Sequence, residues 1–197
     1  MNYYTDRRKV VLIGAGMVGM SFAYVLMYSH VCDELAIIDV DEKKARGEAM
    51  DLNHGLAFSG GNMKIYASDY NSVADADIVV ITAGVSQKPG ESRISLLRRN
   101  SAILSSIAEK CVKNGFDGIF VIATNPVDLM TDMVQRKTGF PKGRVIGSGT
   151  TLDTARLRYL VGSYFGVDPR NVHAYVMGEH GDSEFVPMSQ AYISTKS

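Results

Sequence analysis

The alternation of short apolar runs with longer helix-like stretches constrains the fold of this chain more than any other feature of its sequence. The runs that predict strands are Lys9–Ile13, Leu35–Asp39, Met63–Ala67, Ile78–Thr82, Ile119–Ala123 and Val145–Ile146. They are almost wholly apolar rather than alternating, which is typical of parallel strands buried on both faces. The stretches that predict the intervening helices are Met17–Tyr28, Glu42–Leu56, Arg93–Lys113 and Val127–Thr138. This order predicts right-handed βαβ units and an α/β fold with a doubly wound parallel sheet.

A second section follows the predicted sheet. Its sequence predicts a long helix over Thr150–Phe165 and a strand over Val172–Met177. The section holds about fifty residues, a size at which an independent hydrophobic core is marginal. We therefore expect a first domain over residues 1–147 and, over residues 148–197, the beginning of an α+β domain that the chain does not finish.

Composition and charge exclude several classes of function. Lys and Arg total 21, as do Asp and Glu, so the chain carries no net basic charge for nucleic acid or an anionic membrane. Cys32 and Cys111 lie far apart and in no metal-ligand spacing, which indicates a reduced setting and predicts no metal site. The N-terminus shows no signal-peptide pattern, and the most apolar stretch, Gly16–Met27, is shorter than a membrane span. We expect a soluble cytoplasmic protein.

Residues 14–19, Gly-Ala-Gly-Met-Val-Gly, follow the first predicted strand and open the first predicted helix. In this context Gly14 makes a tight turn, Gly16 lets the backbone approach a pyrophosphate, and Gly19 lets the helix pack closely. The helix N-terminus adds N–H groups and a partial positive charge for the phosphates. Asp39 ends the next strand, where a carboxylate binds the ribose hydroxyls and repels a 2′-phosphate. The pattern predicts NAD binding; a plain glycine turn with a surface aspartate is the alternative.

His180 lies within residues 178–182, Gly-Glu-His-Gly-Asp, directly after an apolar run. Glycines and carboxylates on both sides favour an exposed acid/base over a core residue. A histidine suits that role because its unperturbed pKa is about 6.5.

Two loops after predicted strands each have two interpretations. The loop of residues 83–93, rich in Gly and Pro, is either a mobile lid that carries Arg93 over a ligand or a solvated surface loop. Asn125 either offers its amide to a ligand carbonyl or initiates a turn with Pro126.

Asp153 and Arg156 lie three residues apart early in a predicted helix and therefore share one face. They form a surface ion pair in one interpretation. In the other, Arg156 clamps a carboxylate and Asp153 orients His180. The spacing does not show whether Asp153 reaches His180.

From the glycine motif at Gly14 through Gly-Glu-His-Gly-Asp-Ser-Glu at residues 178–184, the chain resembles bacterial L-lactate dehydrogenases of the lactate/malate dehydrogenase superfamily. The resemblance implies that His180 is the proton donor/acceptor and Asp153 its partner. The substrate residues that it implies are Gln87, Arg93, Asn125 and Arg156, with Arg93 polarising the substrate carbonyl and Arg156 binding its carboxylate. The cofactor residues that it implies are Gly14, Gly16, Met17, Val18, Gly19, Asp39, Lys44, Tyr70, Ala83, Gly84 and Asn125.

The implied reaction is reversible hydride transfer between NADH and pyruvate, giving L-lactate, as in glycolysis and fermentation. Malate dehydrogenases usually carry an arginine at the position of Gln87, so a neutral Gln87 favours pyruvate over oxaloacetate. Arg158 and His173 match positions that bind fructose 1,6-bisphosphate across a subunit interface in bacterial members; two surface residues with ordinary partners are the alternative. A homotetramer is expected of a full-length member.

The length departs from the family pattern. The chain resembles a two-domain member that lacks about its last third, including most of the substrate domain and much of the subunit interface. This leaves a second hypothesis, a nucleotide-binding module that holds NAD without full catalysis.

Overall fold

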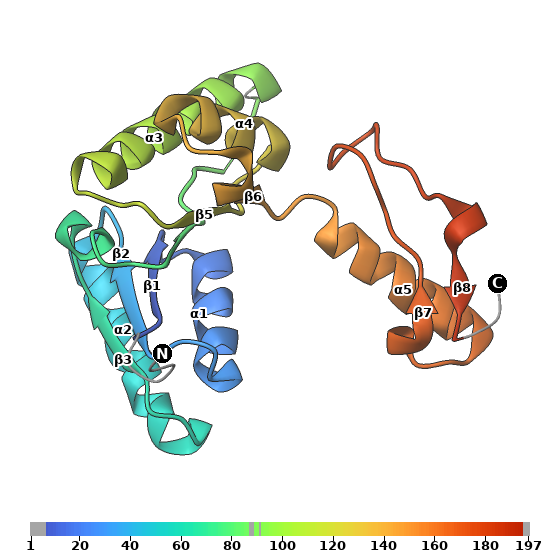
Figure 1. Ribbon diagram of the computed structural model, residues 1–197, viewed down its shortest axis with the longest axis horizontal. Helices are drawn as coiled ribbons and strands as arrows, with labels where there is room; N and C mark the ends of the chain where they lie inside the picture. The colour runs from blue at the N-terminus through green and yellow to red at the C-terminus, as the bar shows by residue number, and fades with distance from the viewer. Residues whose placement is uncertain (1–6, 87–88, 91, 195–197) are drawn as a thin grey trace. The chain divides into compact units, whose positions relative to one another are not determined.

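A six-stranded parallel sheet forms the first part of the computed structural model, which describes residues 7–86, 89–90 and 92–194 (Figure 1). Its strands lie in the order β3-β2-β1-β4-β5-β6, and every neighbouring pair is parallel. Their bounds are β1 Lys9–Ile13, β2 Glu34–Ile38, β3 Lys64–Ala67, β4 Ile78–Ile81, β5 Ile119–Ile122 and β6 Val145–Gly147. The order reverses between β1 and β4, so a crevice for a ligand is expected at the carboxyl ends of these strands.

The helices are α1 Met17–Ser29, α2 Glu42–Ser59, α3 Arg93–Lys113, α4 Val127–Thr138 and α5 Thr151–Phe165. Short 3-10 turns occur at Tyr70–Val73, Lys142–Arg144, Pro169–Asn171 and Met188–Gln190. The predicted α/β fold and its parallel sheet are confirmed, and the strand and helix bounds in this part differ from the predicted ones by at most a few residues.

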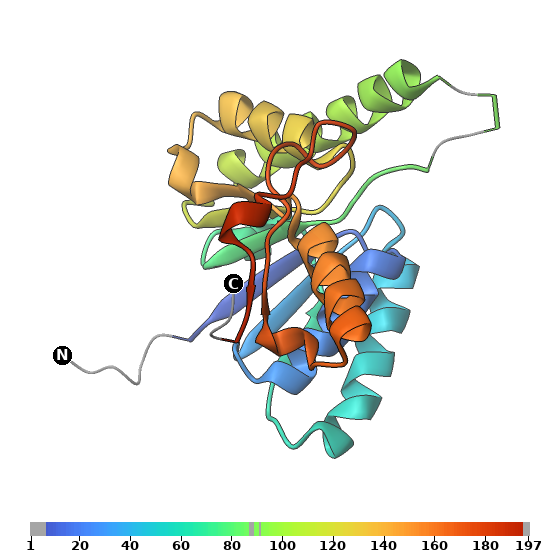
Figure 2. The same ribbon diagram turned by 90° about the vertical axis from the view of Figure 1, so that its right-hand side faces the viewer.

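Each face of the sheet has its own hydrophobic core because successive strand residues point to opposite faces. Val11 and Ile13 of β1 pack into a cluster with residues of α3 and α4, whereas Val10 and Leu12 pack with residues of α1 and α2. Figure 2 shows α3 and α4 above the strands and α2 below them. Burial on both faces explains why the strands are apolar throughout.

Charged residues at the amino ends of the strands are paired with one another. Lys9 and Glu34 are buried and begin β1 and β2. The Lys9 ammonium pairs with Asp75, and the Glu34 carboxylate accepts a hydrogen bond from the Tyr66 hydroxyl and lies 3.6 Å from the Lys64 ammonium. These ion pairs and hydrogen bonds lie at the amino ends of the strands, whereas the ligand crevice is expected at their carboxyl ends. We therefore interpret this network as structural.

The cysteines are buried thiols. Burial raises the pKa of Cys32 to about 11 and that of Cys111 to about 12. At neutral pH both thiols therefore keep their protons, and neither has the thiolate character of a catalytic or metal-binding cysteine.

None of the helices in the described part of the chain is long and apolar enough to cross a membrane.

The described residues fall into two compact units. The first contains the chain up to Asn125 together with Leu129–Gly147, and the second contains Pro126–Asp128 and the chain from Ser148 onward. In the second unit α5 is followed by a two-stranded antiparallel sheet of β7 Val172–His173 and β8 Tyr192–Ile193.

The predicted strand over Val172–Met177 is wrong beyond His173. The chain leaves the ladder because the side chains of Thr150, which precedes α5, and of Thr154 on α5 bind its backbone instead. The Val176 carbonyl accepts a hydrogen bond from the Thr150 hydroxyl at 2.6 Å, and the Val176 N–H donates to the Thr154 hydroxyl at 3.0 Å. Met177 then forms a single bridge with Phe185. An apolar run predicts burial here, but it does not identify which partner satisfies the backbone.

Candidate active site

A cavity of about 760 Å³ lies at the carboxyl ends of the central strands, where the glycine motif meets the loop after β4. Most of the predicted cofactor contacts line it: Gly14, Gly16, Asp39, Lys44, Tyr70, Ala83 and Gly84. Met17, Val18, Gly19 and Asn125, all within the described part of the chain, are not among its lining residues. The cavity lies where an open α/β sheet binds its ligand.

The three glycines of the motif differ in what a side chain at each position would meet. Gly14 has a φ of 110°, and a Cβ there would lie 2.6 Å from the Ala83 nitrogen. A Cβ at Gly19 would lie 2.0 Å from the Gly14 carbonyl oxygen, so a side chain would force α1 off its loop. A Cβ at Gly16 would meet no described atom within 4 Å. Packing within the protein therefore excludes side chains at Gly14 and Gly19, whereas Gly16 borders open space in the cavity.

Asp39 holds the glycine loop as well as facing the cavity. One carboxylate oxygen accepts the Ala15 N–H at 2.7 Å, and the other accepts the Asp41 N–H at 2.9 Å. Each carboxylate oxygen has further acceptor capacity, so these bonds leave room for ribose hydroxyls. Asp39 thus fixes the loop that would meet the pyrophosphate.

The residues present fit a dinucleotide. No side chain in the described part of the chain caps α1 at Gly16, so the first-turn N–H groups and the positive end of the helix are left for an anion. By contrast, the Asp41 carboxylate caps α2 and the Ser92 hydroxyl caps α3. An uncapped helix start beside an open glycine and a carboxylate in the same cavity suits a pyrophosphate and its adenosine.

One wall of the cavity comes from α3, which sequence reasoning missed. The lining residues that it contributes are Ala102, Ile103, Ser106, Ile107 and Lys110, and the strand end and loop add Thr82 and Val85. The sequence predicted a helix over Arg93–Lys113, but not that this helix lines a ligand cavity.

Lys110 and Tyr70 face each other in the cavity. The Lys110 ammonium lies 5.1 Å from the centre of the Tyr70 ring, a cation–π distance. Burial raises the pKa of Tyr70 to about 12. The Tyr70 hydroxyl therefore stays protonated and able to donate a hydrogen bond at neutral pH.

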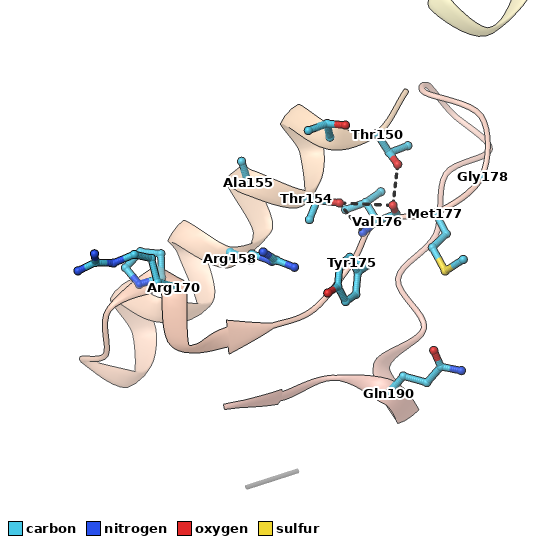
Figure 3. A pocket seen from close by; sticks show the side chains of 12 residues that line it. Thr150, Thr154, Ala155, Arg158, Arg170, Tyr175, Val176, Met177, Gly178 and Gln190 are labelled. Carbon is cyan, nitrogen blue, oxygen red and sulfur yellow. Dashed lines mark hydrogen bonds between the residues drawn. The ribbon is translucent and has the colours of Figure 1, made fainter. Parts of the chain in front are cut away.

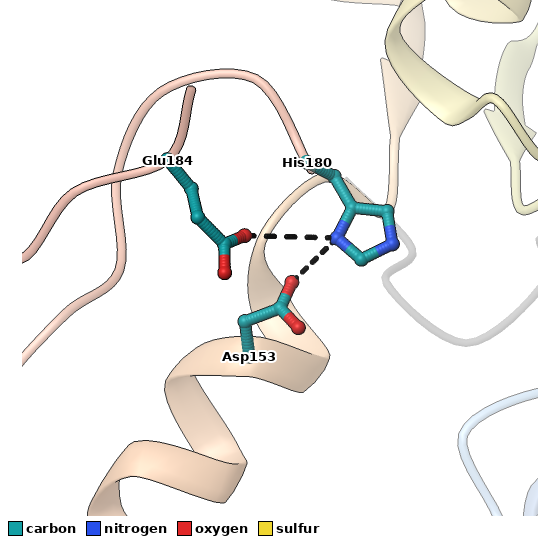
Figure 4. A group of neighbouring side chains, drawn as sticks. All are labelled: Asp153, His180 and Glu184. Atoms are coloured by element: carbon teal, nitrogen blue, oxygen red, sulfur yellow. Dashed lines mark hydrogen bonds and ion pairs between the residues drawn. The ribbon is translucent and has the colours of Figure 1, made fainter. Parts of the chain in front are cut away.

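In the second unit His180 and Asp153 are hydrogen-bonded. The Nδ1 atom of His180 lies 2.6 Å from the Oδ2 atom of Asp153, whose side chain is 10% exposed. Glu184 brings a second carboxylate to 3.8 Å from the same nitrogen. Figure 4 shows both carboxylates on the Nδ1 side of the ring and Nε2 pointing away from them. Asp153 thereby favours the tautomer with the proton on Nδ1, which leaves Nε2 for a substrate.

Among the residues that the structure describes, Asp153, His180 and Glu184 place one ligand atom each within 4.8 Å of the others. Within this group the Nδ1 atom of His180 and the Oδ2 atom of Asp153 lie at hydrogen-bond distance, 2.6 Å apart. We therefore interpret the group as a proton-transfer pair with an additional carboxylate.

The segment that carries His180 is fixed by its own contacts. The His180 N–H donates to the Asp128 carboxylate at 2.8 Å. Upstream, Thr150 and Thr154 hold the Val176 backbone against α5, the helix that also carries Asp153. The hydroxyls thus bring the histidine segment to the face of α5 where Asp153 lies.

Arg156 meets the other oxygen of Asp153. Its Nη1 atom lies 3.2 Å from the Asp153 Oδ1 atom, and its side chain is 63% exposed. Asp153 therefore contacts both Arg156 and His180, one through each carboxylate oxygen.

Of the remaining predicted substrate residues, Arg93 and Asn125 lie within the described part of the chain and Gln87 does not. Arg93 is the first residue of α3, and Gln87 lies outside the described residues. Asn125 is exposed after β5, and its carbonyl accepts a hydrogen bond from the Asn100 amide at 3.2 Å.

A second, open cavity of about 920 Å³ lies between α5 and the segment after β7 (Figure 3). Arg158 lines it, donating from Nε to the Ala174 carbonyl at 3.0 Å and lying 4.6 Å from the centre of the Tyr175 ring. Arg170 also lines it and pairs with Asp168, whose pKa that bond lowers to about 2.

His173 does not line this cavity; its ring stacks on Tyr192 with centres 4.5 Å apart. Arg158 and His173 thus both have partners within the second unit of this chain.

Comparison with known proteins decides the family. Residues 8–147 match the family model of the lactate/malate dehydrogenase NAD binding domain. The chain belongs to the lactate/malate dehydrogenase family. Residues 150–196 match the alpha/beta C-terminal domain of lactate/malate dehydrogenases. The resemblance seen in the sequence is confirmed, and so is NAD as the cofactor of the first domain.

Relatives in the lactate/malate dehydrogenase family are longer than this chain. L-lactate dehydrogenase 2 of Bacillus cereus is 52% identical over 188 residues, which cover 95% of this chain and 60% of that protein. An L-lactate dehydrogenase of Geobacillus stearothermophilus is 53% identical over 94% of this chain and 58% of its own length. The chain therefore spans about 60% of the length of the curated relatives that it matches.

Solved structures of lactate dehydrogenases match nearly all of this chain and about 61% of their own length. The ligand-bound minor L-lactate dehydrogenase from Enterococcus mundtii has a TM-score of 0.95 and 45% identity, over 97% of this chain and 61% of that chain. A lactate dehydrogenase from a deep-sea metagenome library has a TM-score of 0.93 and 52% identity, over 96% of this chain and 61% of its own.

Proposed function

We propose that this chain carries the cofactor site and the proton-transfer pair of an NAD-dependent L-lactate dehydrogenase, which interconverts pyruvate and L-lactate. The observation that carries the proposal is the 2.6 Å contact between His180 Nδ1 and Asp153 Oδ2 in a chain of this family. L-lactate dehydrogenases at 52–53% identity support the choice of reaction.

NADH, when bound, supplies the hydride for C2 of pyruvate. His180 holds a proton at Nε2 and gives it to the carbonyl oxygen as negative charge develops there. Asp153 accepts the hydrogen bond from Nδ1, keeps the ring oriented, and stabilises the imidazolium form before the proton leaves. In lactate oxidation the same nitrogen takes the proton back.

Two arginines bind the substrate in this proposal. Arg156 clamps the carboxylate of pyruvate, because a guanidinium matches a carboxylate with two parallel hydrogen bonds. Its exposure and its single contact to Asp153 Oδ1 leave most of the guanidinium edge for that purpose. Arg93 polarises the substrate carbonyl from the start of α3, stabilising the developing charge.

NAD binding without turnover is the second candidate function. It is favoured by the nucleotide cavity, whose lining residues all lie within residues 8–147, the part that matches the NAD binding domain. The two candidates separate in one preparation of verified intact mass, on which NADH binding and pyruvate-dependent NADH oxidation are both measured. Saturable binding with oxidation supports the dehydrogenase, and binding without oxidation supports the module.

We expect Gln87→Arg to shift the preference from pyruvate toward oxaloacetate. An arginine would pair with the second carboxylate of oxaloacetate, which a neutral glutamine leaves without a counter-charge. The ratio of kcat/KM for oxaloacetate to that for pyruvate should rise at least about tenfold, the equivalent of roughly 1.4 kcal/mol. Gln135→Arg, on α4, is the control. An unchanged ratio would remove Gln87 from the specificity site.

We also propose that Arg158 and His173 bind fructose 1,6-bisphosphate in an assembled enzyme. Cations from two subunits that face a sugar bisphosphate suit its charge. The bisphosphate should activate pyruvate reduction, and the double variant Arg158→Gln, His173→Gln should lose that activation while Arg136→Gln on α4 keeps it. Activation that persists in the double variant would exclude the site.

A homotetramer, a cytoplasmic location and a place in fermentative glycolysis complete the proposal. They follow from the proposed reaction and family, and sedimentation of the purified protein tests the first of them.

A further inference from the structure

Asp128 is a half-buried carboxylate that the proposed mechanism does not use. It lies in the first turn of α4, and its Oδ2 atom accepts the His180 N–H at 2.8 Å. Pro126–Asp128 belongs to the same compact unit as His180 and Asp153. The bond is therefore internal to the unit that carries the proton-transfer pair.

The stretch around His180 has little conformational restraint of its own. Gly178 and Gly181 flank the histidine with φ values of 98° and 147°, which glycine adopts readily and other residues rarely do. The Gly181 carbonyl accepts the Glu184 N–H at 3.1 Å, a bond that lies within the loop itself. Among the described backbone hydrogen bonds of residues 178–182, the one to Asp128 is the only one that leaves this loop. Asp128 thus restrains a segment that its glycines leave free to adopt other conformations.

Two carboxylates from different helices hold His180 at two points. Asp153 on α5 binds the ring at Nδ1 (Figure 4), and Asp128 on α4 binds the backbone N–H. A bond to Nδ1 alone fixes one ring atom, about which the ring and its backbone can still turn. The second fixed point, on the backbone, limits this turning and sets the direction in which Nε2 points.

We propose that Asp128 is a positioning residue for proton transfer, because it anchors the backbone of His180 so that Nε2 meets the substrate oxygen. The inference rests on the proposed dehydrogenase function and adds to it a residue that acts through His180. A general acid must lie within hydrogen-bond reach of the atom that it protonates, and a displacement of about 1 Å can cost about 100-fold in rate. A carboxylate suits the anchor because its hydrogen bonds are about twice as strong as those between neutral groups.

The test compares variants that differ in the acceptor they offer to the His180 N–H. Alanine removes the acceptor, whereas asparagine has nearly the same shape and keeps an oxygen there. We expect Asp128→Ala to lower kcat for pyruvate reduction about 10- to 100-fold. Asp128→Asn should stay within about fivefold of the wild type, since it loses only the charge. The dissociation constant of NADH should change by less than about twofold in both, because Asp128 does not line the nucleotide cavity.

Amide hydrogen exchange at His180, followed by NMR, measures the anchor without turnover. The His180 N–H should exchange at least about tenfold faster in Asp128→Ala than in the wild-type chain, because it has lost its acceptor. Thermal unfolding verifies that each variant keeps its fold. Asp128→Glu, which keeps the charge but moves the acceptor by one methylene, decides the question where the alanine variant does not fold. Its kcat should fall below that of Asp128→Asn.

Asp132→Ala is the matched control. Asp132 lies one turn further along α4, and its carboxylate pairs with Arg136 at 2.8 Å. Its loss should leave both kcat and the exchange of the His180 N–H unchanged.

A wild-type kcat in Asp128→Ala, or a kcat in Asp128→Asn as low as that of the alanine variant, would overturn the positioning role alone. Unchanged exchange at His180 in Asp128→Ala would overturn the anchor itself. A wild-type chain without turnover would overturn the proposed function and, with it, the role in proton transfer, whatever the exchange shows. A loss of kcat in the alanine variant that asparagine largely restores, with NADH affinity retained, supports both.

Discussion

Replacing His180 with asparagine should lower kcat for pyruvate reduction by about 100- to 10,000-fold, the usual contribution of a positioned general acid. Asparagine retains an N–H for Asp153 but has no group that gives up a proton near neutral pH. NADH affinity should stay unchanged, because His180 does not line the nucleotide cavity. The measurements are steady-state kinetics with pyruvate and fluorescence titration with NADH.

The chain contains a matched control for this substitution. His54 on α2 also faces an aspartate, with its Nδ1 atom 3.9 Å from the Asp51 carboxylate, but both side chains are exposed and lie outside the cavity. His54→Asn should leave kcat unchanged. Asp153→Asn should reproduce most of the loss at His180, since an amide no longer stabilises the imidazolium form. Full activity in His180→Asn would mean that another group supplies the proton.

The second large effect is expected in the glycine motif, where one substitution should lower stability and another should lower NADH affinity. Gly19→Ala should lower the free energy of unfolding by about 1–3 kcal/mol or more, because its Cβ would lie 2.0 Å from the Gly14 carbonyl oxygen, a backbone atom. Gly16→Ala should leave the free energy of unfolding nearly unchanged, since φ is −79° there and its Cβ meets no described atom within 4 Å. The same variant should bind NADH at least about tenfold more weakly, because the methyl group occupies space needed by the pyrophosphate.

Denaturant unfolding and NADH titration of the same preparations separate the two effects. Gly47→Ala on the exposed side of α2 is the control, with no described neighbour for its Cβ. It should stabilise the protein by about 0.5–1 kcal/mol, since alanine favours a helix interior, and leave NADH affinity unchanged. Unaltered NADH affinity in Gly16→Ala would contradict the placement of the pyrophosphate at this glycine.

The first unit could be predicted almost entirely from the sequence, because each of its elements depends on a local pattern. β1 and β2 are apolar at nearly every position, and both are buried on both faces. The glycine motif fixes the turn into α1 through its own backbone, as the contacts of Gly14 and Gly19 show. Local patterns of this kind need no knowledge of distant residues.

What could not be predicted depends on contacts between distant segments. The run from Val172 to Met177 has strand composition, but pairing as a strand ends at His173. Hydroxyls of Thr150, just before α5, and of Thr154 on α5 bind the Val176 backbone instead. The wall of the nucleotide cavity formed by α3 could not be predicted either, because it depends on how α3 packs beside the loop after β4.

The pairing of Asp153 with His180 is an intermediate case. The residues around His180 and the spacing of Asp153 from Arg156 made each a candidate, and the resemblance implied that they are partners. Their 2.6 Å contact depends on the path of the chain between α5 and the histidine segment, which 27 residues of sequence do not specify. Gln87 remains a prediction from the sequence, since it lies outside the described residues.

The most direct test of the proposed reaction follows the hydride itself. The purified chain is incubated with pyruvate and NADH deuterated at C4, and the lactate is analysed by mass spectrometry and chiral chromatography, which detect even slow turnover. We expect L-lactate that carries deuterium at C2 from the wild-type chain, and none above background from His180→Asn. A chain that binds NADH and yields no deuterated L-lactate would contradict the dehydrogenase and establish the NAD-binding module in its place.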